Sequence, residues 1–131
     1  TLCITPHPME AARLLQVPLA TVQADRFAAS RALQQRYQAQ VLLKGAGTLL
    51  DDGQEQMVVA DGNPAMASAG MGDVLSGLLG ACLAQQGEAA LALRTAACLH
   101  SAAADNWVLQ HGRRGLIAPD LIEEIRILQN D

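Results

Sequence analysis

Aromatic side chains are nearly missing from this 131-residue sequence, which contains one Phe, one Tyr and one Trp. Modules that bind single-stranded nucleic acid usually stack bases on aromatic rings, so the composition argues against that class. A net positive charge is missing too, because the formal charge is −4 at pH 7. Nucleic acid and anionic membrane surfaces are therefore not expected as partners. A small anionic ligand is still compatible with an acidic chain, since a local site can be electropositive.

Long apolar runs and paired cysteines are also absent. No run approaches the roughly 20 apolar residues that span a bilayer, and the first residues lack the pattern of a secretory signal. Cys3, Cys82 and Cys98 are widely spaced and form no C-x-x-C pair, so we expect buried free thiols in a reducing compartment. Carboxylate pairs at 51–52 and 123–124 are typical of a turn and a helix surface, so no metal site is predicted. These features favour a cytoplasmic enzyme without a membrane partner.

The residues that are abundant are small or aliphatic. Half of the chain is hydrophobic, mostly Ala and Leu, and there are 11 Gly. Small side chains let helices approach a sheet or one another closely, which is typical of a compact layered α/β domain. At this length the chain can form one domain or one part of a larger domain.

Apolar periodicity and turn residues predict short strands that alternate with helices. The predicted strands cover residues 1–5, 41–43, 48–50 and 57–59, and the predicted helices begin at Pro8, near 21, at Asp73, at Glu88 and at Pro119. The helix at 21–38 carries Phe27, Leu33 and Tyr37 at the spacing of one buried face. The alternation predicts a largely parallel, helix-covered sheet with a β-hairpin at 51–54. The strands are few, so we expect the chain to be part of a larger sheet domain.

The sharpest local feature is Gly70-Met71-Gly72-Asp73 at the start of an apolar helix. Glycines at this position let the backbone turn tightly, and the first N–H groups of a helix together with its dipole form an anion site. Gly70, Met71 and Gly72 are the candidate anion hole, and Asp73 could accept a proton from a hydroxyl placed beside a bound phosphate. The competing interpretation is that Asp73 is an ordinary helix N-cap.

A second feature follows a predicted buried strand, at Lys44-Gly45-Ala46-Gly47-Thr48. A cation and backbone amides then lie at the carboxyl end of the strand, where open α/β sheets bind ligands. The P-loop spacing is missing, and an ordinary strand-exit turn with a solvated Lys44 is the alternative.

Three further residues are candidates of lesser specificity. The prolines of Thr5-Pro6-His7-Pro8 restrict the backbone around His7, which could bind a polar ligand or simply cap a helix. Asn63-Pro64 could hold the glycine-rich stretch in place or form an Asx turn. His100 lies in an Ala-rich helix, so we expect it to be packed rather than catalytic.

Taken in order, these motifs resemble the NAD(P)H-hydrate dehydratase family of the ribokinase-like superfamily. The segments that carry the resemblance are Thr5-Pro6-His7-Pro8-x-Glu10, Lys44-Gly45-Ala46-Gly47-Thr48, Asn63-Pro64 with the segment through Gly77, and Gly115-Leu116-Ile117-Ala118-x-Asp120-Leu121. The likeness covers essentially the whole chain and implies a ribokinase-like layered fold. It further implies that residues 1–131 are the carboxyl-terminal part of the dehydratase domain.

The resemblance implies repair of hydrated NADH and NADPH, in which ADP or ATP, with Mg²⁺, phosphorylates the ring hydroxyl and phosphate is then eliminated. It makes Asp73 the base, His7 and Asp73 the substrate contacts, and Lys44 to Thr48 with Gly72 the nucleotide contacts. It also implies a homo-oligomer, with a tetramer as the expected form, and allows a fused epimerase domain in the parent protein.

The motifs also depart from the family pattern. Met9 and Ala65 replace frequent glycines, and Met71 stands where threonine is common. Met71 should be tolerated if that position contributes mainly its backbone amide. Two alternatives remain open: a small-molecule kinase of the same superfamily, such as a hydroxyethylthiazole-kinase-like enzyme, and a nucleotide-binding fragment without turnover.

Overall fold

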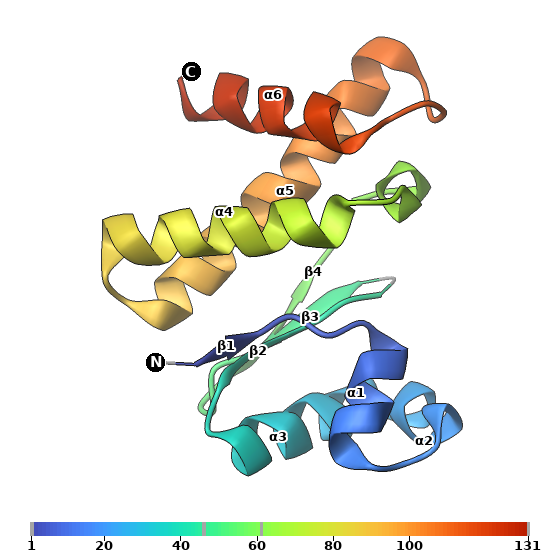
Figure 1. The fold of residues 1–131 in the computed structure, drawn as a ribbon, viewed down its shortest axis with the longest axis vertical. Coiled ribbons are helices and arrows are strands. Elements are labelled where there is room, and N and C mark those ends of the chain that lie inside the picture. The colour runs from blue at the N-terminus through green and yellow to red at the C-terminus, as the bar shows by residue number, and fades with distance from the viewer. Residues whose placement is uncertain (1, 46, 61, 131) are drawn as a thin grey trace. The chain divides into compact units, whose positions relative to one another are not determined.

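The computed structural model describes residues 2–45, 47–60 and 62–130. The chain divides into two compact units, Thr1–Ala60 and Asp61–Asp131, and each is described on its own. In the first unit the elements are β1 (Cys3–Ile4), α1 (Pro8–Leu15), α2 (Leu19–Ala24), α3 (Arg26–Tyr37), β2 (Gln40–Leu43), β3 (Thr48–Asp51) and β4 (Gln56–Val59). In the second they are η1 (Pro64–Ala67), α4 (Met71–Gln86), α5 (Ala89–His111) and α6 (Ala118–Gln129), as Figure 1 shows.

The sheet of the first unit is mixed, in the order β1-β2-β3-β4. The β1–β2 pair is parallel, whereas β2–β3 and β3–β4 are antiparallel. The expectation of a largely parallel sheet is therefore wrong for these strands, although the α/β class and the hairpin are confirmed. Connection length explains the difference, because a parallel pair needs a crossover of a dozen or more residues. Only the β1–β2 connection, which contains α1 to α3, is that long.

One face of this sheet packs against α1, α2 and α3 (Figure 1). Side chains alternate along a strand, so Val41 and Leu43 of β2 point to the same face. Leu49 is the β3 partner of Leu43 and joins them. The buried cluster consists of Ala11, Ala12, Val22, Ala29, Leu33, Val41, Leu43 and Leu49. This cluster fixes the strands whose ends carry the first two motifs.

The helix expected over 21–38 is two helices, because the chain breaks at Asp25. Asp25 has φ −150° and ψ 92°, and its side chain accepts a hydrogen bond from the Ala28 N–H at 3.0 Å. Asp readily caps a helix in this way, so a new helix start competes with continuation of the old one. Leu33 is fully buried, but Phe27 is 50% exposed. The expected buried stripe is wrong at Phe27, since the inner face of α3 carries Ala29, Ser30 and Leu33.

The second unit packs α4 and α6 against α5. Its buried cluster consists of Ala65, Met71, Ala103, Ala104, Trp107, Leu116, Leu121 and Ile125. The Trp107 and His111 rings stack at the end of α5, with centroids 4.7 Å apart. Small residues on α5 permit this close helix packing, as the composition predicts. No helix within the described residues is long and apolar enough to cross a bilayer.

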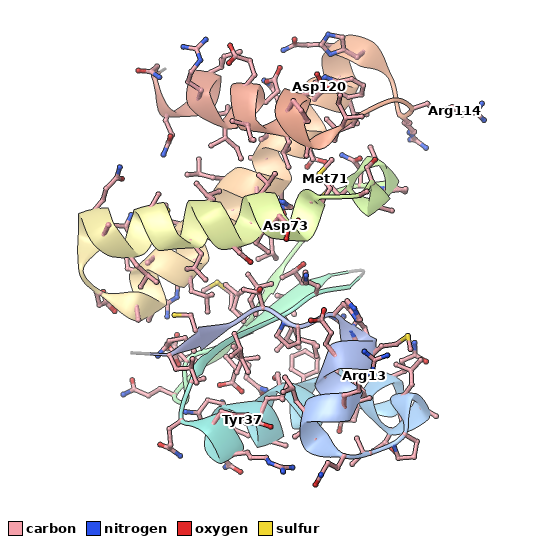
Figure 2. The ribbon with its side chains drawn as sticks, viewed as in Figure 1. Arg13, Tyr37, Met71, Asp73, Arg114 and Asp120 are labelled. Carbon is pink, nitrogen blue, oxygen red and sulfur yellow. The ribbon has the colours of Figure 1, made fainter. Side chains whose placement is uncertain are left out.

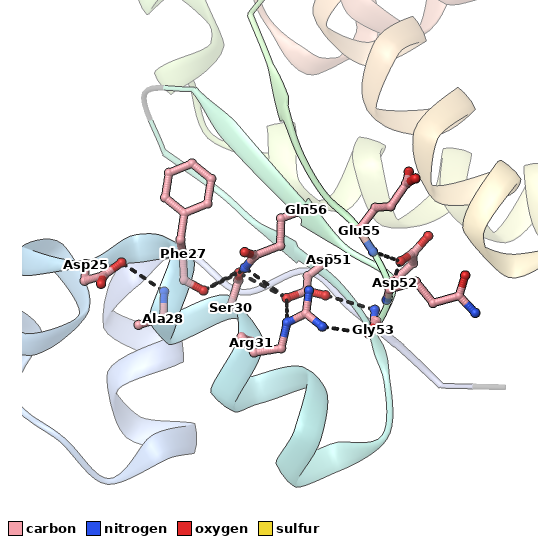
Figure 3. A network of polar contacts seen from close by, with 11 residues as sticks. Asp25, Phe27, Ala28, Ser30, Arg31, Asp51, Asp52, Gly53, Glu55 and Gln56 are labelled. Carbon is pink, nitrogen blue, oxygen red and sulfur yellow. Dashed lines mark hydrogen bonds and ion pairs between the residues drawn. The ribbon is translucent and has the colours of Figure 1, made fainter.

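A buried polar network joins the β3–β4 hairpin to α3 (Figure 3). The carboxylate of Asp51 is fully buried, and its Oδ2 lies 3.0 Å from Nε of Arg31. Asp51 also accepts hydrogen bonds from the Gly53 N–H at 2.9 Å and the Gln56 amide at 3.1 Å. Arg31 donates a further bond to the Gly53 carbonyl at 2.6 Å. The hairpin turn expected at Asp-Gly is thereby tied to a helix, with Gly53 at φ +93°.

Loss of one partner from a buried ion pair is costly, because the other charge stays desolvated. We therefore expect Asp51→Leu to lower the free energy of unfolding by about 3 kcal/mol, the lower end of the usual range, since Arg31 is 30% exposed. Urea unfolding measures this loss. The double variant Asp51→Leu with Arg31→Met removes both charges and should recover at least half of it. A double variant as unstable as the sum of the two single variants would contradict the ion-pair explanation.

Candidate functional site

The histidine and lysine motifs meet at one rim of the sheet in the first unit. Strands β1 and β2 are parallel neighbours, so the residues that follow them leave the sheet at the same edge. The Lys44 N–H donates to the Pro6 carbonyl at 2.9 Å. This hydrogen bond extends the parallel pairing beyond the strands and places the two motifs side by side. The expectation that Lys44 lies at a carboxyl-end rim is confirmed.

His7 is the N-cap of α1. The Glu10 N–H donates to Nδ1 of His7 at 3.2 Å, and the His7 N–H donates to Oε1 of Glu10 at 3.3 Å. Nε2 of His7 lies 2.9 Å from the same Oε1. Since Nδ1 accepts a hydrogen bond here, the ring hydrogen is on Nε2 and faces the Glu10 carboxylate. The capping role proposed as the alternative is present, and the role of His7 as a substrate contact stays a prediction.

The loop between β2 and β3 is held by Arg26 from the first turn of α3. Its Nη1 donates to the Gly47 carbonyl at 2.9 Å, and its Nη2 donates to the carbonyls of Leu43 and Lys44 at 3.2 and 3.4 Å. Gly45 has φ +148° and Gly47 has φ +73°, so both take conformations that favour glycine. Ala46, which was also predicted to contact nucleotide, lies outside the described residues. The strand exit is therefore an organised loop, and the nucleotide-binding roles of Lys44, Gly45, Gly47 and Thr48 stay predictions.

In the second unit the first turn of α4 contains the Gly-x-Gly-Asp motif. The helix begins at Met71 rather than at Asp73, with Gly70 as its N-cap at φ +84°. Its first backbone hydrogen bond runs from the Val74 N–H to the Gly70 carbonyl. The N–H groups of Met71, Gly72 and Asp73 therefore lie ahead of that bond and point out of the helix end. Asp73 is the third helical residue and is exposed, so its interpretation as the N-cap is wrong.

Met71 and Asp73 lie on different sides of this turn (Figure 2). Met71 is 5% exposed and belongs to the buried cluster of the second unit. The Met71 carbonyl accepts a hydrogen bond from Nε2 of the buried His100 at 3.0 Å. A carbonyl can only accept, so His100 carries its hydrogen on Nε2. Met71 thus anchors the turn through its side chain, and its role in the anion hole stays a prediction. The packed role expected for His100 is confirmed.

Gly70 could not be replaced by a larger residue without strain. A Cβ at this position would lie 3.2 Å from Cβ of Ala118, the first residue of α6. The positive φ adds to that constraint, because only glycine adopts it at low cost. Close packing against α6 therefore fixes the point at which α4 begins.

The segment before α4 is fixed by hydrogen bonds to α5 and to the loop before α6. Oδ1 of Asn63 accepts from the Ala65 N–H at 2.9 Å, which is the expected Asx turn. Nδ2 of Asn63 also donates to Asp105 at 2.7 Å, and Asp105 accepts from the Gly62 N–H at 3.1 Å. The Ser68 hydroxyl lies 2.7 Å from the Leu116 carbonyl, to which it donates. Asn63 therefore both forms the turn and holds the segment in place.

The cysteines differ in exposure. The cysteines are free, with Cys82 buried, Cys3 partly buried and Cys98 exposed, so the expectation of buried thiols is wrong for Cys98. Burial raises the pKa of the Cys82 thiol and also that of the Cys3 thiol. Neither thiol is therefore prepared as a thiolate nucleophile. Over residues 2–45, 47–60 and 62–130, no three metal-ligating side chains gather.

The predicted site residues thus form two groups, one in each unit: His7 with the Lys44 loop, and Gly70 to Asp73. Sequence reasoning missed Arg26, Ser68 and Asp105, which hold these groups in place. Arg26 directly follows Asp25, and an Asp that can cap a helix was the available signal that a new helix begins there. Ser68 and Asp105 bond to segments at sequence separations of 48 and 42 residues, which no local pattern reports.

Comparison with known proteins identifies the family. The family described as NAD(P)H-hydrate dehydratase matches residues 1–127. The bifunctional NAD(P)H-hydrate repair enzyme Nnr of Vibrio cholerae is 57% identical over 127 residues, which are 97% of this chain and 26% of that protein. The ADP-dependent (S)-NAD(P)H-hydrate dehydratase of Neisseria meningitidis is 44% identical over 131 residues, with 98% of this chain and 44% of that protein covered.

Among solved structures, the ADP/ATP-dependent NAD(P)H-hydrate dehydratase from Bacillus subtilis co-crystallised with ATP/Mg²⁺ is 28% identical. It superposes with a TM-score of 0.91 over 98% of this chain and 47% of its own. The chain therefore spans between a quarter and a half of the proteins compared here. By its family match and by these relatives, the chain belongs to the NAD(P)H-hydrate dehydratase family.

Proposed function

We propose that this chain supplies the phosphate-handling part of a nucleotide-dependent dehydratase that restores NADH and NADPH from their hydrates. The observation that carries the proposal is the first turn of α4. There the exposed carboxylate of Asp73 stands next to backbone N–H groups that lie ahead of the first helical hydrogen bond. A base beside an anion site is what transfer of phosphate to a hydroxyl requires.

In the proposed reaction, the oxygen of the ring hydroxyl attacks the terminal phosphorus of ADP or ATP, while Asp73 accepts the proton of that hydroxyl. The bond from that phosphorus to the bridging oxygen breaks, and AMP or ADP leaves. Phosphate then departs from the ring with the electrons of the carbon–oxygen bond. The neighbouring ring carbon loses a proton to solvent water, and the electrons of that C–H bond form the double bond. The N–H groups of Met71 and Gly72 would stabilise the negative charge that the transferred phosphate carries.

Lys44 and the loop to Thr48 are the proposed nucleotide contacts. A lysine ammonium and loop amides are suited to phosphate oxygens. Mg²⁺ commonly binds through substrate phosphates and one or two carboxylates. It would therefore be held mainly through the nucleotide, where it neutralises phosphate charge. The Bacillus relative was co-crystallised with ATP/Mg²⁺, which supports binding of nucleotide together with Mg²⁺.

The wider assignments belong to the same proposal. Residues 1–131 would be the carboxyl-terminal part of a dehydratase domain in a cytoplasmic protein that forms an oligomer, with a tetramer as the expected form. A fused epimerase domain is supported by the bifunctional name of the Vibrio relative. The proposal excludes nucleic acid and membranes as partners.

Asp73→Asn tests the base. Incubating the natural full-length protein with hydrated NADH, Mg²⁺ and ADP or ATP should restore the dihydronicotinamide absorbance only when nucleotide is present. We expect Asp73→Asn to lower this rate by roughly 10²- to 10⁴-fold, as for loss of a general base. Asp120→Asn is the matched control, because Asp120 is also the third residue of its helix, α6.

Unchanged turnover in Asp73→Asn would contradict the role of Asp73. A product that keeps the phosphate would instead indicate a kinase of the same superfamily. Nucleotide binding without turnover in the full-length protein would indicate a binding module.

His7→Asn separates the capping role of His7 from substrate contact. Asn is a strong N-cap, so its side chain can still accept the Glu10 N–H, and the midpoint of thermal unfolding should barely change. If His7 contacts the hydrated dinucleotide, loss of one hydrogen bond should raise the KM for that substrate by roughly 3- to 10-fold. Steady-state kinetics at saturating nucleotide measure the change. An unaltered KM in a stable variant would leave His7 as a helix cap only.

A further inference from the structure

Arg26 belongs to none of the sequence motifs, yet its guanidinium contacts the backbone at both ends of the Lys44 loop. It bonds the Gly47 carbonyl through Nη1 and the Leu43 and Lys44 carbonyls through Nη2. Hydrogen bonds from a charged donor are roughly twice as strong as neutral ones. The planar fork of Arg also fixes the direction of each bond, which a lysine ammonium does not do. One side chain therefore bonds the backbone on both sides of the loop, at Leu43 and Lys44 and at Gly47.

Bonding of the carbonyls also orients the amides. In a planar trans peptide the C=O and N–H point in opposite directions. The peptide between Leu43 and Lys44 illustrates this, because its carbonyl accepts from Arg26 while its N–H donates to Pro6. The next peptide unit likewise turns the Lys44 carbonyl toward Arg26. The Gly45 N–H must therefore point away from the guanidinium. On that side it could donate a hydrogen bond to a bound anion.

Gly45 is the counterpart of Arg26 in this arrangement. A Cβ on Gly45 would lie 2.9 Å from Nη2 and 3.2 Å from Cζ of Arg26. Its φ of +148° is also one that residues with a side chain rarely adopt. The space that a side chain at position 45 would need is occupied by the guanidinium, so the glycine and the arginine depend on each other.

We infer that Arg26 is a positioning residue for nucleotide binding, which shapes the Lys44 loop and directs the Gly45 amide toward the phosphates. The inference rests on the proposed function, because it takes this loop as the nucleotide contact. We assign Arg26 to the loop rather than to a phosphate, because its Nη atoms donate to three backbone carbonyls of that loop. The substrate that should sense Arg26 is therefore ADP or ATP, and not the hydrated dinucleotide.

The test compares Arg26→Gln with Arg36→Gln in the natural full-length protein. Arg36 is on the same helix about 15 Å away, so it controls for loss of one positive charge on α3. We expect Arg26→Gln to raise the KM for nucleotide by roughly 10- to 100-fold, as expected for loss of charge-assisted hydrogen bonds. The kcat and the KM for hydrated NADH should change by less than about 3-fold, a split that general destabilisation would not produce.

Two further variants separate shape from charge. Arg26→Lys keeps the charge but loses the fork, so we expect it to remain impaired. Full recovery with lysine would indicate direct attraction of phosphate and would overturn the inference. Gly45→Ala should displace the guanidinium and raise the nucleotide KM as well. In the double variant with Arg26→Gln, Gly45→Ala should raise the nucleotide KM much less than it does in the wild-type background. Fully additive effects of the two substitutions would contradict the dependence of the two residues.

Readouts without turnover keep the inference testable if a variant loses activity. Hydrogen exchange of the peptide over residues 43–49 should be faster in Arg26→Gln than in Arg36→Gln with no nucleotide present. Mg²⁺ with ADP or ATP should raise the midpoint of thermal unfolding less in Arg26→Gln than in the wild type, and as much in Arg36→Gln as in the wild type. Unchanged exchange together with an unchanged thermal shift would overturn the inference. A wild-type protein that binds nucleotide but never restores NADH would contradict the proposed function and not the role of Arg26, whereas a wild type that binds neither nucleotide would contradict both.

Discussion

The parallel pairing of β1 with β2 is the constraint on which the first group of site residues depends. Each strand ends in one of the motifs, and the pairing continues past the strands through the bond from the Lys44 N–H to the Pro6 carbonyl. Because this bond uses backbone atoms, it fixes the separation of the two motifs whatever side chains they carry. The crossover helices then supply Arg26, which holds the loop from the helical side. Although β1 has only two residues, its pairing with β2 therefore places the two motifs side by side.

The second group of site residues is held by packing rather than by a sheet. Met71 is buried among side chains of η1, α5 and α6, and His100 bonds its carbonyl. Gly70 lies so close to Ala118 that the start of α4 has little freedom. Asp73, two residues later, is exposed. A buried anchor two residues before an exposed carboxylate would limit the movement of that carboxylate, which the proposed role of Asp73 requires.

Features that depend on local interactions could be predicted from the sequence, whereas features that depend on contacts between distant segments could not. Local signals located the hairpin, since Asp52 and Gly53 carry the turn chemistry within the segment itself, and they located the end of α4 at Gly87. The strand direction was wrong because it depends on connection length and pairing together. The break at Asp25 was missed because an Asp can cap a new helix or lie inside a continuous one, and the two options have similar free energies. The residues of the motifs could be named, but Arg26, Ser68 and Asp105 bond to distant segments and needed the fold.

The helix starts differ in what satisfies their first N–H groups. In α1, α3 and η1 the cap is a His, an Asp or an Asn whose own side chain accepts one of these hydrogen bonds. The caps of α2, α5 and α6 accept no such bond through a side chain, and Gly70 of α4 has no side chain at all. The positive φ of Gly70 also disfavours any residue that could cap in this way. A side-chain cap on α4 would act as a built-in competitor for any incoming acceptor. Glycine at this position therefore leaves the first N–H groups of α4 without competition from the cap's own side chain, as the proposed anion site requires.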